Sequence, residues 1–107
     1  MPKTIFISAE RPDITKFQHL ILDIDEAILD QIILNLKIKE GLLYTVLRPS
    51  SDFEIYDENI SNLQAEIRRV IPTSTNLSPI SIAFLHMLDA LCTACLQTKY
   101  NLFGFAD

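Results

Sequence analysis

The sequence predicts a small α+β domain, in which a short antiparallel sheet packs on about three helices. The chain has 107 residues, which is the size of a single domain spanning 1–107. Hydrophobic residues make up 49% of it, enough to form a core. Their spacing changes along the chain between the alternation typical of strands and the three- and four-residue steps typical of helices. Strands and helices are therefore both expected.

The first element is predicted to be a strand. Residues 4–8 alternate in character and are rich in β-branched side chains. After Pro12, the helical spacing of Ile14, Phe17 and Ile21 favours a short helical segment.

The next segment is predicted to be a helix over residues 24–40. Asp23 and Glu26 have the spacing of a capping box, and apolar residues then recur at helical steps. Gly41 stands where a helix commonly ends. A strand over the end of this segment is the competing interpretation, because apolar residues alternate with polar ones at Leu34, Leu36 and Ile38.

Residues 42–57 are predicted to form a β-hairpin. The run 42–48 is rich in Leu, Tyr, Thr and Val, and the turn-forming residues 49–52 follow it. Residues 53–56 alternate again and provide the second strand. Together with the N-terminal strand, this hairpin would complete the short sheet.

Two further helices and an apolar tail complete the prediction. Asp57 is expected to cap a helix whose apolar stripe ends at Pro72. Ser78 and Pro79 are typical of a helix start, so a long helix is expected over about 79–99. Its apolar residues face nearly all round, so this helix should be buried. The tail after it should pack down as an edge strand; a docking tail for a larger complex is the alternative.

The charge of the chain is unevenly distributed. Eleven of its 14 acidic residues lie between Glu10 and Glu58, and the net charge is −5. Such a field repels phosphate backbones, so nucleic-acid binding is not expected, and it attracts cationic protein surfaces. The N-terminus lacks a secretory signal, and His86 and Asp89 interrupt the most apolar stretch. We therefore expect a cytoplasmic protein without a membrane span.

Two acidic groups are candidates for binding a partner. Glu54 and Tyr56 alternate away from Phe53 and Ile55, so they should share the solvent-exposed face of their strand. A tyrosine among carboxylates is typical of a surface that binds a basic protein. The first acidic group consists of Asp23, Asp25, Glu26 and Asp30, and the second acidic group consists of Asp52, Glu54, Tyr56, Asp57 and Glu58.

Catalytic residues, metal ligands and cofactors are not predicted. Cys92 and Cys95 have CxxC spacing, but they lie inside a predicted helix, where no helix N-terminus lowers the pKa of a thiol. The chain has two glycines, too few for a glycine-rich phosphate loop. A polar stripe on the same helix, in which Asp89 would orient His86, leaves a small acid–base or redox enzyme as an alternative.

The sequence therefore favours a small acidic binding protein, rather than an enzyme, that masks a cationic protein. The concrete form is a bacterial immunity protein or antitoxin that inhibits a nuclease-type toxin, because nuclease sites are basic in order to hold phosphate. A secretion-type chaperone is a near alternative; it would dimerise and offer an apolar groove to an extended segment. The sequence predicts neither the identity of the partner nor the oligomeric state.

Overall fold

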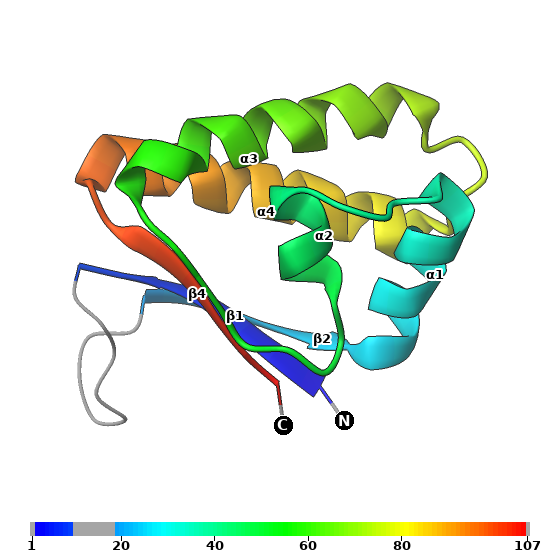
Figure 1. Ribbon diagram of the computed structural model, residues 1–107, viewed down its shortest axis with the longest axis horizontal. Coiled ribbons are helices and arrows are strands. Elements are labelled where there is room, and N and C mark those ends of the chain that lie inside the picture. The colour runs from blue at the N-terminus through cyan, green and yellow to red at the C-terminus, as the bar shows by residue number, and fades with distance from the viewer. Residues whose placement is uncertain (1, 10–18, 107) are drawn as a thin grey trace.

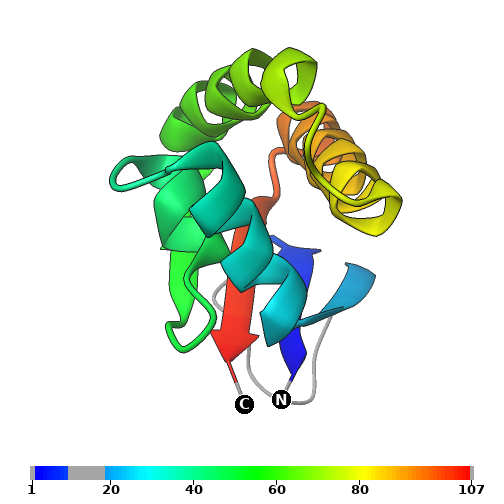
Figure 2. The ribbon, with the colours of Figure 1, turned by 90° about the vertical axis from the view of Figure 1, so that its right-hand side faces the viewer.

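The computed structural model describes residues 2–9 and 19–106, and these form two layers. Helices cover one face of a four-stranded antiparallel sheet (Figures 1 and 2). The α+β class predicted from the sequence is confirmed. The elements in chain order are β1 (Pro2–Ser8), β2 (His19–Asp25), α1 (Glu26–Leu36), α2 (Leu42–Leu47), β3 (Phe53–Ile55), α3 (Asp57–Val70), the 3₁₀ turn η1 (Ile71–Thr73), α4 (Pro79–Thr98) and β4 (Asn101–Ala106).

The strand order of the sheet is β2-β1-β4-β3. The two central strands are thus the first and last strands of the chain, and they run side by side with Lys3 opposite Ala106 (Figure 1). The predicted N-terminal strand is confirmed. The C-terminal tail does form a strand, but an interior one, so its prediction as an edge strand is wrong. Leu102 and Phe103 are fully buried there, so these two residues are not available as a docking tail.

Both faces of the sheet carry apolar side chains. Ile5, Ile7 and Leu102 face the helices and belong to the main core. Phe6 and Phe103 alternate with them and therefore lie on the opposite face, with their ring centroids 5.8 Å apart. Phe105 and Tyr56 extend this aromatic cluster, with centroids 5.5 Å from Phe6 and 6.2 Å from Phe103 respectively. The face away from the helices thus carries a separate aromatic cluster.

The predicted helix over 24–40 begins and ends elsewhere. Residues up to Asp25 pair with β1, so the chain stays extended until the Asp25 side chain accepts a hydrogen bond from the Ala27 N–H (3.0 Å) and caps α1. Asp23 is on β2 and forms no capping box. The helix ends at Lys37, which has a φ of 52°, rather than at Gly41. The competing strand over the end of this segment is also wrong.

The predicted helical segment after Pro12 falls largely on residues 10–18, outside the described residues. Its last member, Ile21, lies on the strand β2.

The predicted hairpin over 42–57 is wrong. Residues 42–47 form the helix α2, and β3 pairs with β4 instead. The Glu66 carboxylate on α3 accepts hydrogen bonds from the N–H groups of Leu42 (3.2 Å) and Leu43 (3.4 Å), which caps the start of α2. Lys3 Nζ donates to the carbonyls of Val46 (2.7 Å) and Arg48 (2.8 Å) at its end. Both capping side chains come from distant parts of the chain.

The two long helices are confirmed with small changes at their ends. Tyr56, rather than Asp57, is the N-cap of α3, and the side chain of Asn101 accepts a hydrogen bond from the Asp57 N–H (3.0 Å). Ser78 caps α4 as predicted, with its hydroxyl accepting from the Ser81 N–H (3.3 Å). Pro72 lies in η1, directly after α3.

The helix α4 is buried on one side and open on another. It packs against α3, β4 and β1, with Phe84, Leu88 and Cys92 in the core. Ile80 (57%) and Met87 (49%) remain substantially exposed. By length and composition α4 could cross a membrane, with a mean hydropathy of 1.6 over an 18-residue window, 39% of which is buried within the fold. The core helix of a globular domain meets the same criterion.

Candidate functional site

The first acidic group lies where β2 passes into α1. Asp23 and Asp25 are exposed on the strand, on the face away from the buried Ile24. Asp23 Oδ1 accepts a hydrogen bond from the Thr4 hydroxyl (2.7 Å), and Asp25 caps α1. Glu26 is half-buried in the first turn of α1, and Asp30 is exposed one turn later. All four carboxylates are therefore positioned by one strand–helix junction.

This junction contains no basic residue. From His19 to Leu36 the chain carries four carboxylates and neither Lys nor Arg. Asp30 is on the exposed side of α1, whereas Leu29 and Ile32 are on the side of the same helix that is buried in the core. Hence the described strand and helix place four carboxylates at this junction without a Lys or Arg within the same stretch.

The second acidic group is divided by the sheet. Asp52 precedes β3, and its Oδ1 accepts a hydrogen bond from the Ala106 N–H at the end of β4 (2.8 Å). Tyr56, Asp57 and Glu58 follow the other end of β3, close to Asn101 at the start of β4. Residues that are neighbours in sequence thus lie at opposite ends of the sheet.

The strand registers place Asp52 at the same end of the sheet as the first acidic group. Asp25 is opposite Pro2, and Lys3 is opposite Ala106, to which Asp52 bonds. Since β2 and β3 are the two edges, three strand spacings of about 4.8 Å, or about 14 Å, separate the backbones of these two strands. One end of the sheet therefore carries acidic residues at both edges.

The surface around Tyr56 is less acidic than the sequence predicts. Tyr56 is exposed, and its hydroxyl donates to Glu54 Oε2 (2.6 Å). It shares a shallow hollow with Asp57 and Glu58, but also with the cation of Lys99. The expectation that Glu54 and Tyr56 share an exposed face is confirmed. The positive charge of Lys99 makes this end the weaker candidate for electrostatic binding.

Lys3 is a buried cation between the sheet and α2. Its side chain is fully buried, donates to two carbonyls and lies 4.7 Å from the centroid of the Phe53 ring. Burial lowers the pKa of Lys3 to about 8, while the nearby Asp52 opposes this shift. Its role is to satisfy the carbonyl end of α2, so it presents no charge to a partner.

The two cysteines are core residues. Cys92 and Cys95 are fully buried in α4, and both are free thiols. Burial raises the pKa of each thiol to about 12, and the neighbouring Cys95 adds to the shift at Cys92. A thiol with so high a pKa provides almost no thiolate at neutral pH. The geometry therefore supports a packing role for the pair.

The polar stripe of α4 is used mainly for packing against α3. Arg68 Nε and Asp89 Oδ1 form an ion pair at 3.0 Å. The buried Gln64 donates to the Thr93 hydroxyl (2.8 Å) and to the Asp89 carbonyl (3.2 Å). The Asp89 carboxylate thus pairs with an arginine of α3, and His86 is exposed on the helix surface. Within residues 2–9 and 19–106, no group of three or more His, Cys, Asp or Glu side chains is arranged to hold a metal ion.

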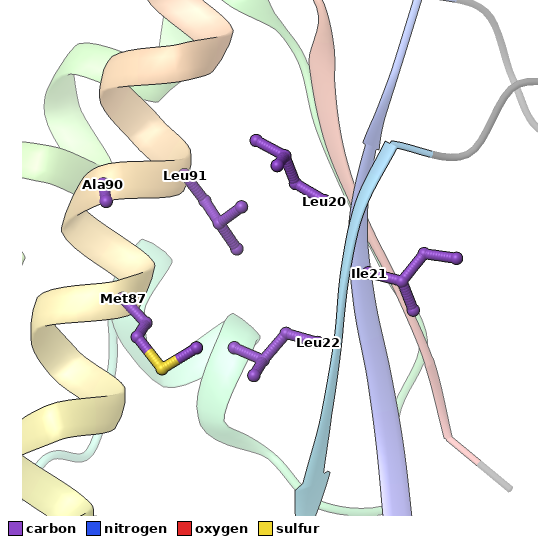
Figure 3. Close-up of a pocket in the computed structure, with 6 residues that line it drawn as sticks. All are labelled: Leu20, Ile21, Leu22, Met87, Ala90 and Leu91. Atoms are coloured by element: carbon purple, nitrogen blue, oxygen red, sulfur yellow. The ribbon is translucent and has the colours of Figure 1, made fainter.

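The structure reveals an apolar groove that sequence reasoning missed. It lies between the edge strand β2 and the open side of α4, and its volume is about 250 Å³ (Figure 3). Leu20 and Leu22 point into it from the strand, and Met87 and Leu91 from the helix. The sequence did indicate the groove in one way, because apolar residues face nearly all round α4. That pattern was interpreted as complete burial of the helix. The groove is lined by Leu20, Ile21, Leu22, Met87, Ala90 and Leu91.

Comparison of the chain with models of protein families, with curated proteins and with solved structures finds no match in any of the three.

Proposed function

We propose that this protein binds and masks a cationic protein, with the first acidic group as the main contact surface. The observation that carries this proposal is the exposed carboxylate cluster at the β2–α1 junction, in a stretch of 18 residues, 19–36, without Lys or Arg. Such a surface raises the rate of encounter with a cationic protein and favours it over neutral or acidic competitors. Asp52 adds a carboxylate at the far edge of the same end of the sheet, where the exposed Arg48 also lies close enough to act on Lys3.

The most concrete form of this function is inhibition of a nuclease-type toxin by an immunity protein or antitoxin. A nuclease site is basic because it binds phosphate, and an acidic protein that covers it excludes the substrate. The net charge of −5 and the small size of the chain fit a soluble inhibitor of this kind. The proposed partner is thus a basic protein, with no part for a nucleic acid or a membrane.

A secretion-type chaperone is the second candidate, and the groove between β2 and α4 favours it. Chaperones of extended segments need an exposed apolar surface, and this groove provides one. The two functions differ in what the partner offers. An inhibitor covers the cationic active site of a folded partner and can also bind an extended segment of that partner, whereas a chaperone binds its client before the client has folded.

Affinity capture from the native cell tests the proposal. The tagged protein is incubated with extract at low and at high salt, and the bound proteins are identified by mass spectrometry. We expect one stoichiometric basic protein at low salt and much less of it at high salt, because salt screens charge pairs beyond about 10 Å. A partner that is retained equally at both salt concentrations, or one that is acidic, would contradict the proposal.

A matched pair of variants assigns the surface. E26Q/D30N removes two charges from the first acidic group, and D57N/E58Q removes two from the second, so the net charges of the two variants are equal. E26Q/D30N should capture less of the partner than the wild type, and D57N/E58Q should capture about as much.

A further inference from the structure

The groove lies beside the open edge of the sheet. In the described part of the chain, β2 pairs with β1 on one side and with no strand on the other. An edge strand presents unpaired backbone N–H and C=O groups, onto which an extended peptide adds as a further strand. The groove runs along this edge, with α4 as its opposite wall (Figure 3). Backbone pairing and an apolar channel are thus available at the same place.

The two faces of β2 have different chemistry. Leu20 and Leu22 point toward α4, whereas Ile21 points away from it (Figure 3). Asp23 and Asp25 follow Ile21 on the face away from α4, because side chains alternate along a strand. An added strand must therefore place one set of side chains against an apolar groove and the other set beside carboxylates.

We propose that an extended segment of the cationic partner adds to the β2 edge, with apolar and basic residues alternating along it. Its apolar side chains enter the groove between Leu22 and Met87. Its basic side chains lie on the opposite face beside Asp23 and Asp25, where opposite charges on neighbouring strands attract. This inference rests on the proposed function, and it specifies which part of the partner is bound and in what conformation.

The charges on β2 argue against a second copy as the occupant. A dimer formed through two β2 edges would bring Asp23 and Asp25 of both copies to one shared seam. Like charges on adjacent strands are destabilising, and charged edge strands are a common protection against self-association. A segment with lysine or arginine at alternate positions relieves the same repulsion. Charge complementarity therefore selects a basic partner.

Synthetic peptides test the inference without the partner. The probe is a seven-residue peptide in which valine alternates with lysine, and binding is followed by backbone amide NMR shifts during titration. Two control peptides keep the alternation and change one type of side chain each. In the first control, serine replaces valine, which removes the apolar side chains. In the second control, glutamate replaces lysine, which reverses the charge. We expect saturable shifts along β2 with the valine–lysine peptide and binding at least about tenfold weaker with both controls.

Two substitutions on α4 provide a matched pair of variants. M87K places a charge in the groove, and I80K places the same charge on the same helix outside the lining residues. Both side chains are exposed, so neither change is expected to unfold the domain, and thermal melting checks this. M87K should weaken binding of the valine–lysine peptide about tenfold, and I80K should change it by less than about twofold.

Four results would overturn the inference. The first is equal binding of the valine–lysine peptide to M87K and to the wild type. The second is a set of NMR shifts that map away from β2. The third is a wild-type dimer that M87K converts to a monomer, which would make a second copy the occupant of the groove. A captured basic partner that binds M87K as tightly as the wild type would also overturn it, while leaving the proposed function intact.

Discussion

Lys3 shows how a single buried charge organises one end of the molecule. Its ammonium group donates to two carbonyls at the end of α2 and lies against the Phe53 ring, so it joins β1, α2 and β3. At the start of the same helix, the Glu66 carboxylate lies so close to Gly41 that a Cβ at this position would collide with it. Gly41 has a φ of 99°, which glycine adopts without strain. A six-residue helix is thus capped at both ends by distant side chains.

Lys3 and the two cysteines predict how stability depends on pH. The pKa of Lys3 is about 8 in the folded protein and 10.5 in the unfolded chain. Between these values the unfolded chain binds more protons at this group, so its contribution to the free energy of unfolding increases with pH. The thiols of Cys92 and Cys95 behave in the opposite way. Their pKa rises from 9.0 to about 12 on folding, so above pH 9 they lower the stability.

Urea unfolding between pH 7.5 and 10, under reducing conditions, measures these contributions. We expect the free energy of unfolding to rise from pH 8 to 9 and then to fall, because two thiols outweigh one amine. Each unbalanced proton changes the slope by about 1.4 kcal/mol per pH unit. The variant C92A/C95A should continue to rise above pH 9, and K3M should lose the rise between 8 and 9. A wild-type curve that is flat from pH 9 to 10 would contradict this account.

At the scale of elements, helices and strands that depend on local sequence signals were predicted correctly, whereas those that depend on contacts with distant residues were not. The bounds of the helices α3 and α4 were predicted within a few residues. The signals for each helix, namely its apolar residues, its N-cap residue and a proline at one end, all lie within or next to the helix itself. The helix α2 was predicted as a strand, because the Glu66 and Lys3 side chains that cap it lie far away in sequence. Residues 19–25 were assigned largely to a helix, although pairing with β1 makes them a strand. Pairing between distant strands has no local signature.

The candidate site was likewise predictable only where its residues are close together in the sequence. The members of both acidic groups were chosen from the sequence, and those of the first group are together in the structure. The second group was divided, because the extended strand β3 lies between Asp52 and Tyr56 and places them at its opposite ends. The groove required two elements that are about 65 residues apart in sequence, so it could be recognised only after β2 and α4 had been placed.

The packing of β3 on β4 gives a prediction at this scale. Gly104 is opposite Phe53, and a Cβ added at Gly104 would overlap the Phe53 ring. The substitution G104A should therefore destabilise the domain by about 1–3 kcal/mol, as overpacking of a core does. Chemical denaturation measures the loss. In the double variant F53L/G104A the two effects should be non-additive, because the smaller side chain leaves room for the Cβ. Purely additive losses would exclude this contact as the cause.

At the scale of the whole molecule, sheet order decides where charge is presented. The strand order β2-β1-β4-β3 brings the start of β1 and the end of β4 together at the centre, with the first acidic group at one edge and Asp52 at the other. The opposite end carries Tyr56 beside Lys99, where acidic and basic groups are mixed. The helices lie on one face of the sheet, and among the described strands β2 has no partner on its outer edge, beside the acidic junction (Figure 2). Under the proposed function, the end with the first acidic group is the one that faces the cationic partner.

The rate of association with the captured partner tests this account most directly. It is measured by stopped flow at several ionic strengths for the wild type, for E26Q/D30N and for D57N/E58Q, which have matched changes in net charge. At low salt, E26Q/D30N should associate about three- to tenfold more slowly than the wild type, and D57N/E58Q should differ little from it. The difference should vanish at high salt, where charges are screened. Association rates that do not depend on salt, or that fall equally in both variants, would contradict the claim that the first acidic group guides a cationic partner to this end of the molecule.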